Sequence, residues 1–104
     1  MATFRFSHRA EADLWGIGDY TLRKWGKAQT VLYLKEMEIC CQMLADNPAL
    51  GRHSDEVRSG LRRFECGKHV VFYRQVPGGI LISRILHQTM LPDRHTIDDQ
   101  NDGP

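Results

Sequence analysis

The stretch that decides the fold runs from Leu61 to His87 and reads LRRFECGKHVVFYRQVPGGILISRILH. Its apolar residues recur with a period of two or form short apolar runs, as is typical of β-strands. The pattern predicts three strands, over residues 61–66, 69–76 and 80–87. The linkers Gly67-Lys68 and Pro77-Gly78-Gly79 are so short that they join only antiparallel neighbours.

Upstream of this stretch the apolar period changes to three or four residues, which indicates helices. Ser7 is a good N-cap for a helix from Arg9 to about Trp25, which Gly26 ends. A second helix is predicted from about Lys27 to Asp46, where Asn47-Pro48 stops it. With so short a connection, the two helices form an antiparallel hairpin.

Residues 2–6 alternate between apolar and polar and predict a short N-terminal strand, whereas residues 47–60 have the composition of a loop. The predicted class is α+β: the N-terminal strand and the helix hairpin pack on one face of an antiparallel sheet of about four strands. We expect one domain over residues 1–97 and a flexible acidic tail over 98–104. The predicted core residues are Leu14, Ile17, Trp25, Tyr33, Met37, Leu44, Phe72 and Ile82, and Trp15 is also expected to pack.

Charge is distributed unevenly along the 104 residues, although the formal net charge is only +1. Residues 1–51 carry six basic and six acidic side chains, and residues 52–95 carry eight basic against four acidic ones. Residues 96–104 contain three aspartates and no basic residue. The low net charge argues against a nucleic-acid coat, while the basic second half suggests an anionic partner.

The apolar runs and the cysteines limit the class of protein further. No apolar run approaches the ~20 residues that cross a bilayer, and the N-terminus lacks the apolar segment of a signal peptide. A disulfide between the adjacent Cys40 and Cys41 would be strained, and with Cys66 they form no zinc-binding spacing. We therefore expect reduced cysteines that pack as apolar residues in a cytoplasmic protein, without metal or cofactor.

The arginines of the predicted sheet are the main candidates for a binding site. Arg62, Arg63, Arg74 and Arg84 lie among apolar strand residues, and by parity Arg84 shares a face with Ile80, Ile82 and Leu86. Guanidinium groups on an uncovered sheet face could bind phosphate, nucleic acid or an acidic peptide. The alternative is that they pair with nearby carboxylates or extend along the sheet edges.

Histidines suggest a second possibility. His87 and His95, with Arg94 beside the latter, follow the last strand. A histidine near arginines can act as a general acid on RNA while the arginines stabilise the phosphate. The alternative is a hydrogen-bonded structural histidine, and the spacing of His87 and His95 matches no recognised metal site. No nucleotide-binding or hydrolase motif is present in the sequence.

The chain resembles the ParE toxins of the RelE/ParE toxin–antitoxin superfamily over about residues 3–96. The resemblance is carried by Ala12-Asp13-Leu14, Ile17, Asp19-Tyr20-Thr21, Trp25-Gly26, Gln29 and Tyr33 in the helix hairpin. It continues through Leu44-Ala45, Pro48, Leu50-Gly51-Arg52, Asp55-Glu56-Val57-Arg58 and Gly60-Leu61-Arg62. It ends with His69-Val70-Val71-Phe72-Tyr73-Arg74, Arg84-Ile85-Leu86-His87, Met90 and Arg94-His95.

The resemblance implies a small cytoplasmic toxin that inhibits DNA gyrase by binding, without catalysis. A ParD-like antitoxin would neutralise it through a C-terminal segment that is disordered when free, and would bind operator DNA through a ribbon-helix-helix module. The expected docking surfaces are the groove beside the helix hairpin and the exposed sheet edge. The predicted antitoxin- or target-binding residues are Arg62, Arg63, Arg74, Arg84, His87, Arg94 and His95.

Two alternatives remain open at the level of sequence. RelE-type members of the superfamily cleave mRNA on the ribosome, and here His87, Arg84 and Arg74 would carry that chemistry. Those members usually have a basic residue soon after the histidine and then a tyrosine, whereas this chain has Gln88 and no tyrosine after Tyr73. The resemblance therefore favours gyrase inhibition. The second alternative is a binding module without toxicity.

Overall fold

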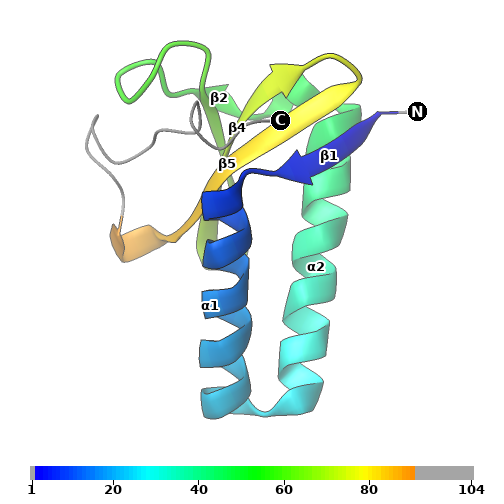
Figure 1. Cartoon of the computed structure of the whole chain (residues 1–104), viewed down its shortest axis with the longest axis vertical. Helices are drawn as coiled ribbons and strands as arrows, with labels where there is room; N and C mark the ends of the chain where they lie inside the picture. Colours follow the sequence, from blue (N-terminus) through cyan, green and yellow to red (C-terminus); the bar gives the residue numbers. More distant parts are fainter. Residues whose placement is uncertain (1, 91–104) are drawn as a thin grey trace.

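The computed structural model describes residues 2–90, which form two helices packed on one face of a five-stranded sheet (Figure 1). The chain begins with β1 (Thr3–Phe6) and continues through α1 (His8–Trp25) and α2 (Lys27–Asp46). A 3-10 turn (Pro48–Leu50) and the short β2 (Arg52–His53) lead into the sheet hairpins. These consist of β3 (Arg62–Cys66), β4 (His69–Val76) and β5 (Gly79–His87), followed by a 3-10 turn (Gln88–Met90).

The strands lie in the order β1-β5-β4-β3-β2. β2 to β5 are antiparallel to their neighbours, as the short linkers predicted, but β1 pairs with β5 in parallel and makes the sheet mixed. β1 and β5 approach so closely that a Cβ on Gly79 would lie 1.7 Å from the carbonyl oxygen of Thr3. The α+β class is confirmed. Alternation predicted β1 but not its parallel pairing at the edge of the sheet, and it did not indicate the two-residue β2.

A β-bulge in β5 changes which of its side chains face the helices. Phe72 pairs with Arg84 and Tyr73 with Ile82, so Ser83 is the extra residue of β5 at this point of the register. An extra residue shifts the alternation by one. Ile82 and Ile85 therefore lie in the same core cluster beneath the helices, whereas strict parity placed them on opposite faces. The prediction that Ile82 and Arg84 share a face is wrong for this reason.

Ser7 connects β1, α1 and the bulge. Its hydroxyl accepts a hydrogen bond from the backbone N–H of Ala10, as an N-cap does, and donates one to the carbonyl of Ser83. The backbone N–H of Ser7 donates to the carbonyl oxygen of Ile82. At the other end of α1, Gly26 has a positive φ of 88°, which turns the chain directly into α2. Both helix boundaries at this turn match those predicted.

Asp13 holds α1 against the part of β5 that β1 does not reach. The register of β1 ends at Ile82. Beyond it, the Asp13 carboxylate accepts hydrogen bonds from the backbone N–H of Ile85 at 2.9 Å and from Nε of Arg84 at 2.7 Å. A second guanidinium nitrogen of Arg84 lies 3.0 Å from the other carboxylate oxygen. The side chain of Arg84 is only 20% exposed and that of Asp13 only 13%. Through this ion pair, α1 covers the edge of β5 beyond the end of β1.

Most residues predicted for the core are buried or packed against it. Ile17, Met37, Leu44 and Ile82 are at most 8% exposed and share one cluster, against which Leu14 and Tyr33 are partly buried. Phe72 is fully buried in a second, smaller cluster. Trp25 is an error: it is 60% exposed, and Trp15 is 81% exposed. The physical reason is visible in Figure 1, where the turn between α1 and α2 extends beyond the end of the sheet. No strand is available there for Trp25 to pack against.

The cysteines also differ from expectation. Cys40 of α2 forms a disulfide with Cys66 at the end of β3, and only Cys41 of the three is a buried free thiol. The sequence argument considered a bond only between the adjacent Cys40 and Cys41, which would be strained, and so predicted reduced cysteines. The tertiary structure instead places α2 over the end of β3, 26 residues further along the chain.

Replacing Asp13 with asparagine is expected to lower the free energy of unfolding by about 3 kcal/mol, because Arg84 would keep its buried charge and lose its counterion. Thermal and urea unfolding of Asp13→Asn beside the unmodified protein measure this difference.

Asp19→Asn is the matched control, since Asp19 forms an exposed ion pair with Arg23 on the same helix. Its expected cost is below about 0.5 kcal/mol. Equal losses in the two variants would show that Asp13 has no special role.

Candidate functional site

The sheet face away from the helices, called here the outer sheet face, carries a cluster of three arginines. Arg5 of β1 and Arg74 of β4 both pair with Leu81, and Phe4 and Phe6 on either side of Arg5 pack toward the helices. Alternation therefore points Arg5 to the outer face. The pKa of Arg74 is lowered, first by burial of the Arg74 guanidinium and then by repulsion from Arg58 and Arg5. We call Arg5, Arg58 and Arg74 the guanidinium cluster.

Two of the predicted binding arginines form hydrogen bonds within the fold. Arg84 bonds to Asp13, as described above. Arg62 donates to the carbonyl oxygen of Gly51 at 2.6 Å. The same loop is held by the Tyr73 hydroxyl, which donates to Pro48 at 2.7 Å and accepts from the N–H of Gly51 at 2.8 Å. Arg62 and Arg84 therefore stabilise the positions of a loop and a helix.

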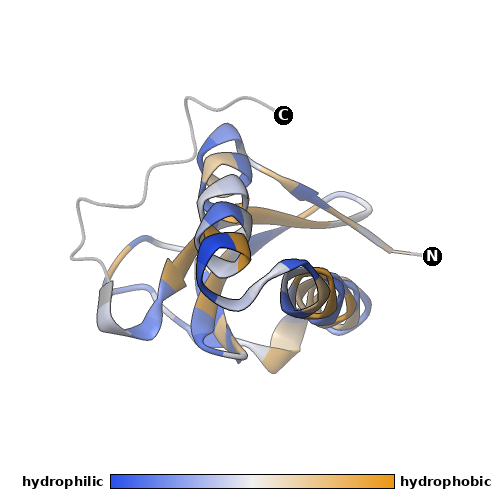
Figure 2. Cartoon of the chain, turned by 90° about the horizontal axis from the view of Figure 1, so that it is seen from below, coloured by the Kyte–Doolittle hydropathy of each residue, from blue (hydrophilic) through white to orange (hydrophobic). Residues whose placement is uncertain are grey.

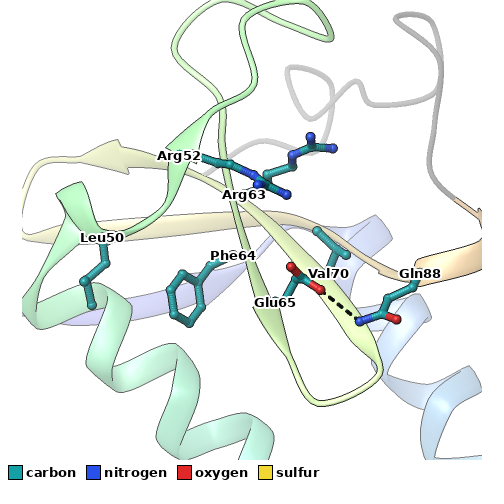
Figure 3. Close-up of a pocket in the computed structure, with 7 residues that line it drawn as sticks. All are labelled: Leu50, Arg52, Arg63, Phe64, Glu65, Val70 and Gln88. Atoms are coloured by element: carbon teal, nitrogen blue, oxygen red, sulfur yellow. Dashed lines mark hydrogen bonds between the residues drawn. The ribbon is translucent and has the colours of Figure 1, made fainter.

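Arg63 lies in a pocket of about 520 Å³ beside β3 (Figure 3). Arg52 of β2 is its partner in the register, so two guanidinium groups line one part of this pocket. The Nε atom of Arg63 is buried and has no hydrogen-bond partner among residues 2–90. In another part of the pocket, Gln88 donates to the Glu65 carboxylate at 3.0 Å. The pocket could accept an anionic side chain beside Arg63.

His87 belongs to a separate group of rings on the helix side. Its Nδ1 lies 3.0 Å from the Thr89 hydroxyl, and its ring meets that of His69 edge-on at 5.4 Å. The Tyr33 hydroxyl lies 2.5 Å from Nδ1 of His69 and accepts from the backbone N–H of Lys68. The pKa of His69 is lowered, first by burial and then by the neighbouring His87. The negative charge of Asp13 raises the same pKa and partly offsets this effect.

The residues proposed for RNA cleavage are not brought together. His87 pairs with His69 at one end of β4, whereas Arg74 lies five residues further along that strand. At the usual rise per residue this separates them by about 16 Å. The guanidinium of Arg84 is held by Asp13. Within residues 2–90, no group of three His, Cys, Asp or Glu side chains is placed to hold a metal ion.

The outward side of α2 is apolar, in addition to the side that faces the core. Met37, Cys41 and Leu44 are buried, while Leu32, Ile39 and Met43 point roughly the opposite way and are 52%, 62% and 37% exposed. We call these three residues the outer stripe. Their spacing of seven and four residues is that of one helix face. Figure 2 looks at the two helices from the end where they are joined, and both carry hydrophilic as well as hydrophobic segments.

Sequence reasoning missed Arg5 and the outer stripe. Alternation in residues 2–6 separates Arg5 from Phe4 and Phe6, so the signal for its outward position was present. The outer stripe was harder to find, because a helix that is apolar on both sides shows only a weak period. The predicted binding residues Arg94 and His95 lie outside the described part of the chain, as does the acidic tail.

The chain matches a family model described as "ParE toxin of type II toxin-antitoxin system, parDE" over residues 4–92. A protein of Caulobacter vibrioides named Toxin ParE1 is 40% identical over 95 residues, which cover 91% of this chain and 98% of that one. A Toxin ParE1 of Mycobacterium tuberculosis is 39% identical, covering 88% and 95% of the two chains. The Toxin ParE of Escherichia coli is 35% identical, covering 86% and 88%.

A solved structure shares the fold. It is described as the chromosomal ParDE TA system from P. aeruginosa, and it covers 84% of this chain and 96% of its own with a TM-score of 0.70 at 21% identity. Neither α1 nor α2, nor any other helix between residues 2 and 90, has an apolar stretch of the length that crossing a membrane requires. The match over residues 4–92 and the identities of 35–40% over nearly full length show that the chain belongs to the ParE family of type II toxin–antitoxin toxins.

Proposed function

We propose that the protein is a toxin that arrests growth by binding DNA gyrase in the cytoplasm, and that a ParD-like antitoxin neutralises it. The observation that carries the proposal is family membership over residues 4–92. Gyrase inhibition is what the resemblance to ParE toxins implies. The arrangement of the sheet supports binding rather than catalysis, because Arg74, Arg84 and His87 do not converge on one point.

The outer stripe supports an antitoxin that contributes an amphipathic helix. Leu32, Ile39 and Met43 form an apolar row on the side of α2 away from the core, and a helix with two apolar sides gains stability when both are covered. A segment that is disordered when free can fold onto such a row as it binds. The antitoxin's separate ribbon-helix-helix module would then bring operator DNA to the complex.

The guanidinium cluster and the pocket beside Arg63 support an acidic stretch in the same antitoxin. Arg5 is exposed, and Arg63 carries a buried nitrogen that has no hydrogen-bond partner in the described part of the chain. Carboxylates placed at these positions would form charge-assisted hydrogen bonds. Because Arg62 and Arg84 hold the fold together, their charge reversal would change stability as well as binding. Arg5 and Arg63 are therefore the cleaner residues for testing this contact.

A supercoiling assay with purified protein and gyrase tests the proposed target. We expect loss of supercoiling and accumulation of cleaved DNA complexes at excess toxin, and recovery of both when the antitoxin is added first. Induction of the gene without its antitoxin should stop growth.

The alternatives give different results in the same experiments. Growth arrest with normal supercoiling, together with cleaved mRNA in a translation reaction that is lost in His87→Ala, would replace gyrase inhibition with ribosome-dependent cleavage. Normal growth after induction would indicate a binding module without toxicity.

Replacing Ile39 with lysine is expected to weaken antitoxin binding by about thirtyfold, because it places a charge at the centre of the outer stripe. Isothermal titration or surface-binding measurements with the cognate antitoxin give the change in Kd.

Val31→Lys is the control, since Val31 is 57% exposed on α2 but lies off the outer stripe. It should change Kd less than about threefold, and both variants should keep the unfolding temperature of the unmodified protein. Equal weakening by the two variants, or no effect of Ile39→Lys, would exclude the outer stripe as the docking site.

A further inference from the structure

The disulfide between Cys40 and Cys66 links the helix layer to the sheet. Cys40 lies in the second half of α2 and Cys66 is the last residue of β3. Their Cα atoms are 6.2 Å apart, within the range that a disulfide spans. The bond therefore closes without displacing either element. It encloses a loop whose ends are 26 residues apart in sequence.

The same junction is also held by interactions that do not depend on the disulfide. The Tyr33 hydroxyl of α2 contacts Nδ1 of His69 and the backbone N–H of Lys68, both of which adjoin β3. Met37 is 3% exposed and Cys41 is fully buried in the core beneath α2. Because these contacts keep α2 in place, we expect the reduced chain to retain its fold. The disulfide can then open and close in the folded protein.

A small pocket gives access to the sulfur atoms. It has a volume of about 160 Å³ and is lined by Cys40 and Cys66 together with Tyr33, Glu36 and Glu65. Cys40 is half-buried whereas Cys66 is 5% exposed, so an incoming thiolate would reach Cys40 first. Cys41 points into the core and is fully buried, and burial followed by the nearby Glu38 raises the pKa of its thiol to about 12. Cys41 is therefore a poor competitor for exchange.

We propose that Cys40 and Cys66 form a reversible redox-modification site, at which thiol–disulfide exchange makes and breaks a covalent link between α2 and β3. In reduction, a thiolate attacks the sulfur of Cys40, and Cys66 leaves as a thiolate that takes up a proton. A second thiol then releases the mixed disulfide, so the protein gains two thiols and the reductant becomes a disulfide. In oxidation, a low-molecular-weight disulfide accepts the two electrons and becomes two thiols.

The charges around the pocket select among thiols. Glu36 lines it, as does Glu65, whose carboxylate accepts a hydrogen bond from Gln88 in the pocket beside Arg63. Among residues 2–90, no lysine or arginine lines it. The thiolate of glutathione carries more negative charge than that of dithiothreitol, so glutathione is repelled there more strongly. Exchange with glutathione is therefore slowed at low ionic strength, and added salt screens the repulsion. The site responds best to a neutral thiol or to one delivered by a protein partner.

Thiol trapping of the full chain, with and without dithiothreitol under native conditions, tests the proposal. After denaturation, the oxidised protein should label at one cysteine, Cys41, and the reduced protein at all three. The oxidised form should unfold roughly 10 °C higher, because the link restricts the unfolded chain. Cys40→Ala and Cys66→Ala should remove this difference, whereas Cys41→Ala should keep it.

Three results would overturn the proposal. Labelling of three thiols after treatment with hydroxyethyl disulfide, an uncharged oxidant, would show that the bond does not form. A bond that dithiothreitol reduces only after denaturation would show a permanent structural disulfide. An unfolding temperature that is the same in both states would show that the link does not stabilise the chain.

Glu36→Gln provides a separate test of the charge effect. It should speed reduction by glutathione about threefold at low salt and reduction by dithiothreitol by a smaller factor. An unchanged ratio of the two rates would overturn the selection of thiols by charge. None of these measurements involves gyrase, the antitoxin or growth, so their outcome is separate from that of the proposed function.

Discussion

The unpaired edge of β5 is the constraint on which the arrangement of the helices depends. β5 has nine residues and β1 has four, so the parallel pairing ends at Ile82. No other strand of residues 2–90 continues along that edge. Unpaired backbone groups at a buried edge are costly. The N–H of Ile85 and the guanidinium of Arg84 meet the Asp13 carboxylate, and the carbonyl of Ser83 meets the hydroxyl of Ser7. These bonds determine where α1 crosses the sheet, and α2 follows from the turn at Gly26.

The position of α1 also separates the core from the surfaces available to partners. The hairpin extends beyond the sheet, so Trp25 lies outside the core and α2 keeps its outer stripe exposed. On the outer sheet face, loop residue Val57 and several strand residues form a second small core, and the guanidinium cluster lies on the same face. The proposed contacts with an antitoxin use the outer stripe and the arginines of the outer sheet face. The disulfide lies between these regions and joins the two layers.

Features that depend on residues close together in the chain could be predicted from the sequence, and features that depend on distant residues could not. The caps at Ser7 and Gly26 and the period of each segment located the helices and four of the five strands to within a residue or two. The roles of Arg62 and Arg84 were not local, because their partners Gly51 and Asp13 are 11 and 71 residues away. A sequence pattern shows that such an arginine lies on a strand but does not show what its guanidinium bonds to.

The sequence by itself determined the α+β class, the order of the elements and the family, because period, capping and turn chemistry depend on residues close together in the chain. Only the tertiary structure decided that β1 runs parallel to β5, that a bulge at Ser83 shifts the side chains of β5, and that Cys40 meets Cys66. Each of these depends on contacts between elements distant in sequence. A one-residue shift in a strand reverses its faces without a local signal. The basic second half of the sequence likewise has roles that depend on distant contacts. Arg62 and Arg84 bond to other parts of the fold, and their sequence neighbours do not indicate this.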